Sequence, residues 1–161
     1  MITQELVKEL FKYKDGELYW KISNGKVKIG NKAGCSDTKG YLRTTIKGKL
    51  YKNHQIIFLM FYGYIPKITD HINGIKYDNR IENLREAKLS QNAQNAKMPK
   101  TNTSGVKGVS WNKRAKKWHV QLHVNGELKY FGRYYCIQFA EFVANIMRHK
   151  YHGEFANNGR I

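Results

Sequence analysis

Residues 69–92 read TDHINGIKYDNRIENLREAKLSQN, and this segment contains side chains suited to hydrolysis. Asp70 stands beside His71, and Asn83 and Asn92 follow at wide spacing. A carboxylate and an amide oxygen, from Asp70 and Asn92, are ligands that a hard divalent cation prefers. The imidazole of His71 can take a proton from water, and Asn83 can accept a hydrogen bond from that ring and fix its orientation. Phosphodiester cleavage needs this combination of a cation and a base.

The same segment also has an explanation in turn chemistry. The Asn-Gly and Asp-Asn pairs within it are turn formers, and a lone Asp-His pair is more often structural than catalytic. Asn92 and Asn95, which fall in a predicted helix, could equally be exposed helix residues or phosphate contacts. Residue types and spacing alone leave both explanations open.

Side chains so far apart in the chain can meet only if short elements fold back on one another. The apolar neighbours of the Asp-His pair predict a strand over residues 68–72, which ends at an Asn-Gly turn. A polar loop follows, and residues 81–84 return as a second short element. Residues 85–96 have helical composition. Strand, loop, strand and helix can therefore converge on one site.

The rest of the chain has clear element signals. Upstream of the site we expect a helix over 1–12, strands over 16–22, 41–48 and 49–53, a turn at 23–26, and an apolar helix over 53–63. Downstream we expect a linker over 98–104, strands over 106–112, 117–124 and 128–134, and a helix over 136–153. The Asn-Gly at 125–126 predicts a hairpin. In the last helix, the apolar spacing predicts a buried face of Ile137, Ala140, Phe142, Val143, Ile146 and Met147.

Charge is the strongest compositional signal. The chain of 161 residues has a net charge of +17, of which residues 1–97 carry +9 and the remainder +8. A polyanion that contacts both parts is the natural partner. No stretch approaches 18 apolar residues, so no membrane span is expected, and the N-terminus lacks the apolar core of a signal peptide. The two cysteines have neither zinc-ligand nor disulfide spacing, so we expect reduced thiols and a cytoplasmic location.

The segment DHINGIKYDNRIENLREAKLSQN resembles the HNH endonuclease motif, in the form whose last His is replaced by Asn. The resemblance extends more loosely over residues 13–95. It implies a ββα-metal site in which Asp70 and Asn92 hold one Mg²⁺ or Mn²⁺ ion, His71 is the general base, and Asn83 orients it. It gives no role to Asn79 or Asn95, and it makes His54 structural or phosphate-touching. The cysteine pairs of some members are missing, so no structural zinc is expected.

Residues 104–156 resemble the apetala-two, or ethylene-response-factor, DNA-binding domain. The Gly-Val at 108–109, Lys-Trp at 117–118, YFGRY at 130–134 and the closing HGEFA carry this resemblance. It implies that a three-stranded sheet enters the major groove while a helix packs behind it. The arginines that read guanine in the plant proteins are replaced by Ser110, Asn112 and His123, so base preference does not carry over.

Alternation along KWHVQLHV independently predicts which face of the sheet packs on the helix and which is polar. Trp118, Val120, Leu122 and Val124 share one face and should pack on the helix. The polar face is free to meet DNA bases, and the turn before it can meet phosphates. The predicted nucleic-acid contacts are Ser110, Asn112, Lys113, Arg114, Lys116, Lys117, His119, Gln121, His123 and Tyr130. The alternative is a polar face that is merely solvated.

Together these patterns predict an α+β protein with an HNH nuclease domain over 1–97, which begins with a strand-rich extension over 1–52. The linker joins it to an apetala-two-like domain over 105–161, a three-stranded antiparallel sheet packed on one helix. The expected function is a phage-encoded, homing-type endonuclease that acts on double-stranded DNA as a monomer or homodimer. A DNA-binding protein with an inactive nuclease domain is the first alternative. An RNA-binding or RNA-cleaving protein is the second, disfavoured because the sheet lacks stacked aromatics.

Overall fold

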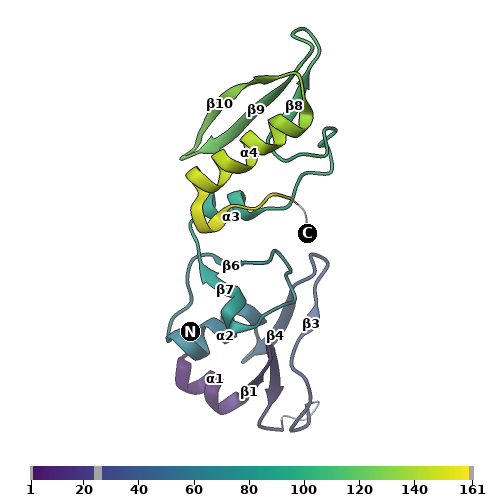
Figure 1. Cartoon of the computed structure of the whole chain (residues 1–161). Helices are drawn as coiled ribbons and strands as arrows, with labels where there is room; N and C mark the ends of the chain where they lie inside the picture. The colour runs from purple at the N-terminus through teal and green to yellow at the C-terminus, as the bar shows by residue number, and fades with distance from the viewer. Residues whose placement is uncertain (1, 24–26, 160–161) are drawn as a thin grey trace. The chain divides into compact units, whose positions relative to one another are not determined.

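The computed structural model describes residues 2–23 and 27–159, so most of the turn expected at 23–26 lies outside the described residues. Within them the chain is a mixed α/β protein with four α-helices and several small antiparallel sheets (Figure 1). It divides into two units, Met1–Ala87 and Lys88–Ile161. No helix in the described ranges is long and apolar enough to cross a membrane.

Short strands dominate the first unit. In chain order it contains α1 (Gln4–Leu10), β1 (Phe11–Lys14), β2 (Glu17–Trp20), β3 (Cys35–Ser36), β4 (Leu42–Ile46), β5 (Lys49–Lys52), α2 (Asn53–Tyr62), β6 (Thr69–His71), the 3₁₀ turn η1 (Ile81–Asn83) and β7 (Leu84–Glu86). The strands form three antiparallel sheets, β1-β2, β3-β4-β5 and β6-β7.

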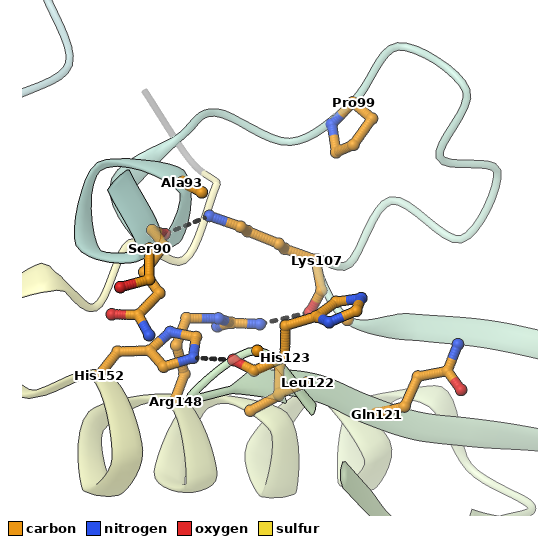
Figure 2. Close-up of a pocket in the computed structure, with 12 residues that line it drawn as sticks. Ser90, Ala93, Pro99, Lys107, Gln121, Leu122, His123, Arg148 and His152 are labelled. Carbon is orange, nitrogen blue, oxygen red and sulfur yellow. Dashed lines mark hydrogen bonds between the residues drawn. The ribbon is translucent and has the colours of Figure 1, made fainter. Parts of the chain in front are cut away.

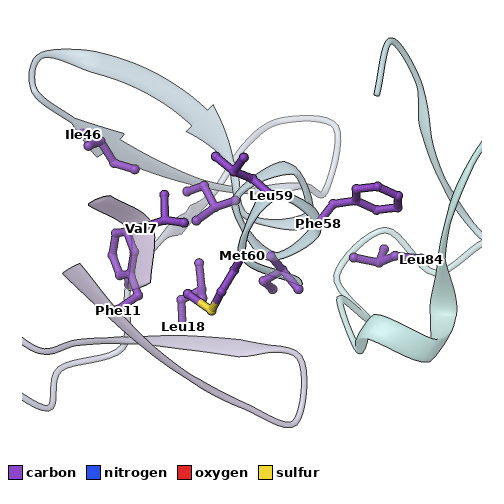
Figure 3. Packing of buried hydrophobic residues seen from close by; sticks show 11 residues of the cluster. Val7, Phe11, Leu18, Ile46, Phe58, Leu59, Met60 and Leu84 are labelled. Carbon is purple, nitrogen blue, oxygen red and sulfur yellow. The ribbon is translucent and has the colours of Figure 1, made fainter. Parts of the chain in front are cut away.

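Helix α2 is the centre of the first unit's hydrophobic core. Its residues Ile56 and Ile57 are fully buried, and side chains from α1, β1, β2, β4 and β7 surround it (Figure 3). Because α2 is apolar on nearly every side, it can be stable only when covered all round. It ends at Gly63, which adopts the left-handed conformation and bonds back to Leu59. The β6-β7 hairpin packs on this rigid centre through Leu84.

One element of the first unit differs from the sequence prediction. The helix expected over 1–12 ends at Leu10, and Phe11–Lys14 forms strand β1. The cause is the following Asp15-Gly16 turn, in which both residues have positive φ and which folds β1 back on β2. A Cβ on Gly16 would lie 2.7 Å from the backbone nitrogen of Arg80, so only glycine fits there.

The second unit consists of a sheet, a long helix and two shorter pieces. It contains α3 (Leu89–Asn95), β8 (Val109–Asn112), β9 (Lys117–Val124), β10 (Glu127–Tyr134), α4 (Ile137–His152) and the 3₁₀ turn η2 (Gly153–Phe155). The sheet order is β10-β9-β8, all antiparallel, and α4 packs on it. Val120, Leu122 and Val124 are buried as the alternation predicts.

Helix α3 groups with the second unit, ahead of the residues expected to form a linker. Asn157 Nδ2 donates to the carbonyl of Asn95 at 2.8 Å, and Lys107 Nζ donates to the carbonyl of Gln94 at 2.9 Å. These bonds hold the C-terminal end of α3. The sequence had placed this helix with the preceding strands, and the domain limits at 97 and 105 stay a prediction.

The buried face of α4 also differs from the expected one. Ala140, Ala144, Arg148 and His152 are buried, whereas Phe142 is 58 % and Ile146 45 % exposed. Two alanines at i and i+4 let the helix axis lie close to the sheet, and the larger apolar residues then fall on the outer side. The buried arginine is the feature that an apolar periodicity cannot predict.

Candidate active site

The β6-β7 hairpin positions the Asp-His pair. Asp70 lies opposite Arg85 in the antiparallel register, and His71 lies opposite Leu84. Arg85 Nε donates to Asp70 Oδ2 at 2.9 Å, and the Asp70 side chain is only 6 % exposed. An ion pair between opposed residues on two strands restricts the carboxylate to one orientation. The carboxylate and the imidazole are therefore held as neighbours at the end of one strand.

The imidazole of His71 is buried and hydrogen-bonded. Its Nε2 lies 2.9 Å from Oδ1 of Asn79, which is itself 1 % exposed. Burial lowers the pKa of His71, and the hydrogen bond with Asn79 and the negative charge of Asp70 oppose that change without cancelling it. The ring is therefore neutral at pH values where an ordinary histidine is partly protonated.

Asn79 is hydrogen-bonded to His71, whereas the hydrogen bonds of Asn83 lie within the loop, and the orienting role expected for Asn83 stays a prediction. Asn83 Nδ2 donates to Asn73 Oδ1 at 3.0 Å and to the carbonyl of Asp78 at 2.7 Å, and Asn83 Oδ1 accepts from the backbone of Asn73. Asn83 stands at the end of η1, and its amide is used to hold the loop. Asn79, on that same loop, is thereby placed against the imidazole.

Turn chemistry accounts for other polar residues of the segment. The carboxylate of Asp78 accepts from Nε and a terminal nitrogen of Arg80, each at 2.8 Å, and from Asn73 Nδ2 at 2.7 Å. These hydrogen bonds, that from Arg80 foremost, lower the pKa of Asp78 to about 2. Turn chemistry therefore explains Asn73 and Asp78, which build the loop. Site chemistry remains the explanation for Asn79, which is hydrogen-bonded to His71.

A second histidine lies against the first. His54, in the first turn of α2, is 4 % exposed, and its ring meets that of His71 edge-on with centroids 5.0 Å apart. Tyr41 lies 5.4 Å from His54 and 6.1 Å from His71. Burial, and then the charges of His71 and Lys52, lower the pKa of His54 to about 3. His54 is therefore a neutral, buried ring that packs against His71, and the structural or phosphate-touching role expected for it stays a prediction.

The expected metal ligands lie in different units. Asp70 belongs to the first unit, and Asn92, half-buried on α3, belongs to the second, so their joint binding of one ion stays a prediction. Across the described residues no group of three or more His, Cys, Asp and Glu side chains could hold a metal. One carboxylate and one amide still fit Mg²⁺ or Mn²⁺, which accept oxygen ligands and retain waters or substrate phosphates in the remaining positions.

The outer face of the second unit's sheet gathers polar and aromatic side chains. Ser110 lies opposite His119 between β8 and β9, and Gln121 lies opposite Tyr130 between β9 and β10. Of the residues expected to contact nucleic acid, Ser110, Lys113, Arg114, Lys116, His123 and Tyr130 are exposed, and Asn112, Lys117, His119 and Gln121 are half-buried. Asn112 also has a local task, since its Oδ1 accepts from the backbone of Ala115 at 2.7 Å.

Arg133 shares this face, and the sequence analysis missed it. Strict alternation from Tyr130 would turn Arg133 toward the helix, but the register shifts between these two residues, so that Arg133 lies opposite His119 and is exposed. Its guanidinium lies 5.8 Å from the centre of the Tyr130 ring. Gly132 inside the strand was the available signal, because an interior glycine often marks a bulge.

The second unit also has a pocket of about 430 Å³, lined in part by Lys107, His123, Arg148 and His152 (Figure 2). Arg148 is fully buried and donates to the carbonyl of Lys107 and to Oδ1 of Asn158. His152 Nε2 lies 2.9 Å from the carbonyl of His123. Arg148 and His152 thus hold a backbone carbonyl each, and Arg148 also holds Asn158, which is a structural role.

Comparisons with known proteins found a family match and a phage relative. A family model described as HNH endonuclease matches residues 51–94, from β5 to α3. Protein 3.8 of Escherichia phage T7 is 33 % identical over 110 residues, which cover 67 % of this chain and 90 % of that protein. No solved structure matches the chain.

Proposed function

The chain belongs to the HNH endonuclease family, with its HNH domain at residues 51–94, and on this premise we propose that it is a metal-dependent endonuclease that hydrolyses a phosphodiester bond in double-stranded DNA. The observation that carries the proposal is the buried His71, which is hydrogen-bonded to Asn79 and follows Asp70, whose carboxylate is paired with Arg85. The net charge of +17 favours a polyanionic substrate.

In the proposed mechanism His71 is the general base. If Nε2 carries the ring proton and donates it to Asn79 Oδ1, the lone pair is on Nδ1, which can take a proton from the attacking water. The lowered pKa keeps this nitrogen unprotonated at neutral pH. Asn79 acts as the positioning residue, a role that the sequence had assigned to Asn83.

Asp70 and Asn92 are the proposed ligands of one Mg²⁺ or Mn²⁺ ion. Such an ion supplies positive charge that stabilises the departing 3′ oxygen. The ion pair with Arg85 holds the Asp70 carboxylate in one orientation. The family resemblance implies products with 5′ phosphate and 3′ hydroxyl ends.

The second unit is proposed to bind duplex DNA as an apetala-two-like module. Its outer sheet face would read bases through Ser110, His119, Gln121 and His123, with Arg133 now added. The basic turn of Lys113, Arg114 and Lys116 would contact phosphates. The open face with its exposed Tyr130 and Arg133 supports this assignment over a merely solvated sheet.

A phage-encoded, homing-type enzyme in the host cytoplasm remains the proposed context. One site per chain implies that a monomer nicks one strand, or that a homodimer cuts both. Relatedness to a phage protein supports the phage origin.

Nicking of supercoiled plasmid tests the activity. Incubation with Mg²⁺, and separately with Mn²⁺, should convert supercoiled to open circular DNA, and chelation should stop the reaction. A DNA-binding protein with an inactive nuclease would bind the plasmid without nicking it under any metal. Preferential binding or cleavage of RNA over duplex DNA of the same sequence would favour the RNA alternative.

A further inference from the structure

Two lysines converge on the aromatic ring that borders the histidine pair. Lys52 Nζ lies 4.4 Å from the centre of the Tyr41 ring, and Lys76 Nζ lies 5.1 Å from the same centre. The ring of Tyr41 contacts both His54 and His71. Lys52 ends β5 and Lys76 comes from the loop after β6, so segments well separated in sequence bring positive charge to one place.

This gathering of charge goes against local electrostatic preference. Two ammonium groups beside one ring repel each other, although the ring face attracts each of them. Lys52 also stands at the N-terminal end of α2, where the helix dipole is positive, and the first turn of α2 contains no acidic residue. Lys76 Nζ donates to the carbonyl of Lys39 at 3.0 Å, which holds it in place. Like charges gathered at one spot against the local preference mark a candidate functional site.

We propose that Tyr41, Lys52 and Lys76 form a binding site for one backbone phosphate of the DNA strand that is cut, next to the phosphate attacked at His71. This inference rests on the proposed function. A phosphate group has several oxygens that can accept from ammonium groups, and its negative charge offsets the repulsion between the two lysines. The rigid β5-α2 junction positions Lys52, so the site would set the register of the strand relative to the imidazole.

Salt dependence of DNA binding tests this site directly. The Lys52→Met/Lys76→Met variant removes both charges and keeps most of the side-chain length, whereas Lys52→Arg/Lys76→Arg keeps the charges. Lys12→Met/Lys49→Met is the matched control, because both residues are exposed on strands of the same unit. Affinity for a duplex is measured from 50 to 300 mM salt with Ca²⁺ in place of Mg²⁺, and thermal unfolding checks each fold.

Each lost phosphate contact should reduce the slope of log affinity against log salt by about 0.9. We expect the Met pair to lose this one contact, the Arg pair to match the wild type, and the control pair to change less than the Met pair. If the Met pair fails to fold, Lys76→Met alone serves, since removing the charge of this exposed side chain should weaken the same phosphate contact, and lower the slope by part of that amount, without affecting the core. A wild-type slope in a folded Met variant would overturn the proposal.

Two further measurements, competition by inorganic phosphate and nicking by the wild-type protein, separate a DNA-phosphate site from the alternatives. Inorganic phosphate at millimolar concentration should compete weakly with DNA at this site. A site for free phosphate would instead show strong competition in the wild type that the Met pair abolishes, with an unchanged slope for DNA. Absence of nicking by the wild-type protein would defeat the nuclease proposal, but the slopes would still decide whether the lysines bind a DNA phosphate.

Discussion

Each unit buries a polar cluster, and the two clusters differ in the origin of their members. In the first unit Asp70, His71, Asn79 and Asn83 lie within one short stretch of chain. In the second unit Arg148 joins the carbonyl of Lys107 to Asn145 and Asn158, which come from separate segments. The first cluster is a local loop resting on a hairpin, whereas the second fastens distant parts of the chain together.

The difference shows how to distinguish a buried structural cluster from a candidate site, because burial alone does not. Burial lowers the pKa of His71, and it lowers the pKa of Lys107 to about 8. The donors of Lys107 and Arg148, however, meet backbone carbonyls and amide oxygens that hold loops and the end of α3. In the first unit the imidazole of His71 is hydrogen-bonded to Asn79, and this bond fixes the orientation of the ring. Variants that remove each group in turn test that distinction.

Removing the imidazole should slow the chemical step strongly while sparing the fold. His71→Ala is expected to slow nicking by about 10²–10⁴-fold, the usual contribution of a general base. Affinity for DNA should remain near the wild-type value, because Asp70 and the basic surface are untouched. Equal losses of binding and nicking would instead indicate that His71, like Arg148, is a structural residue.

Removing the buried guanidinium should do the opposite. Arg148→Leu leaves the acceptors on Lys107, Asn145 and Asn158 without donors, which should lower the unfolding free energy of the second unit by about 3 kcal/mol. Denaturant unfolding followed by tryptophan fluorescence in a Trp20→Phe background would report on that unit alone. Lys150→Leu, exposed on the same helix, is the control and should have little effect.

Acid should destabilise the first unit through His54. The pKa of this histidine is about 3 when folded, against an ordinary value of 6.5. Between these values the unfolded chain binds a proton that the folded chain does not, so stability falls as pH falls. From this group alone, unfolding free energy should be about 2 kcal/mol lower at pH 5 than at pH 8. His54→Phe, which keeps a ring against Tyr41, should remove that part of the pH dependence.

Substitutions at Asn79 and Asn83 should have different effects on the nicking rate. Asn79→Ala is expected to reduce the rate about 10–100-fold, the range typical of residues that orient a catalytic or ligating group. Asn83→Ala should chiefly lower stability, because its amide binds the loop at Asn73 and Asp78. If Asn83→Ala, folded and at saturating DNA, lost more activity than Asn79→Ala, the assignment from the sequence would be restored.

Much of this framework could be predicted from residue types. Strand β6, the Asn125-Gly126 hairpin and the alternation in β9 follow from local rules, and the structure contains each of them. Strand β1 was missed because helical composition continued through Phe11 until a turn reversed the chain. The face of α4 was misjudged because apolar periodicity counts Phe142 as buried and excludes Arg148.

The candidate site also contains residues that the sequence could place and residues that it could not. Asp70 and His71 could be placed together because they are adjacent on a strand. The choice between Asn79 and Asn83 depends on how the loop closes, and spacing does not encode that. Arg133 depends on a bulge that shifts the register by one residue. Sequence therefore predicts what a regular element carries, and errors gather where a loop or an irregularity decides the direction of a side chain.

The smallest effect on the rate should come from the basic turn of the second unit. Replacing Lys113 and Arg114 with Gln and Lys116 with Asn removes three charges, and Asn suits the positive φ at position 116. Binding should lose roughly three phosphate equivalents of salt dependence, while the nicking rate at saturating DNA should stay close to wild type, because chemistry is proposed to occur in the other unit. An unchanged slope would move the phosphate contacts elsewhere. A large loss of rate at saturating DNA would mean that DNA binding and hydrolysis are coupled between the two units. Neither function could then be assigned to a single unit.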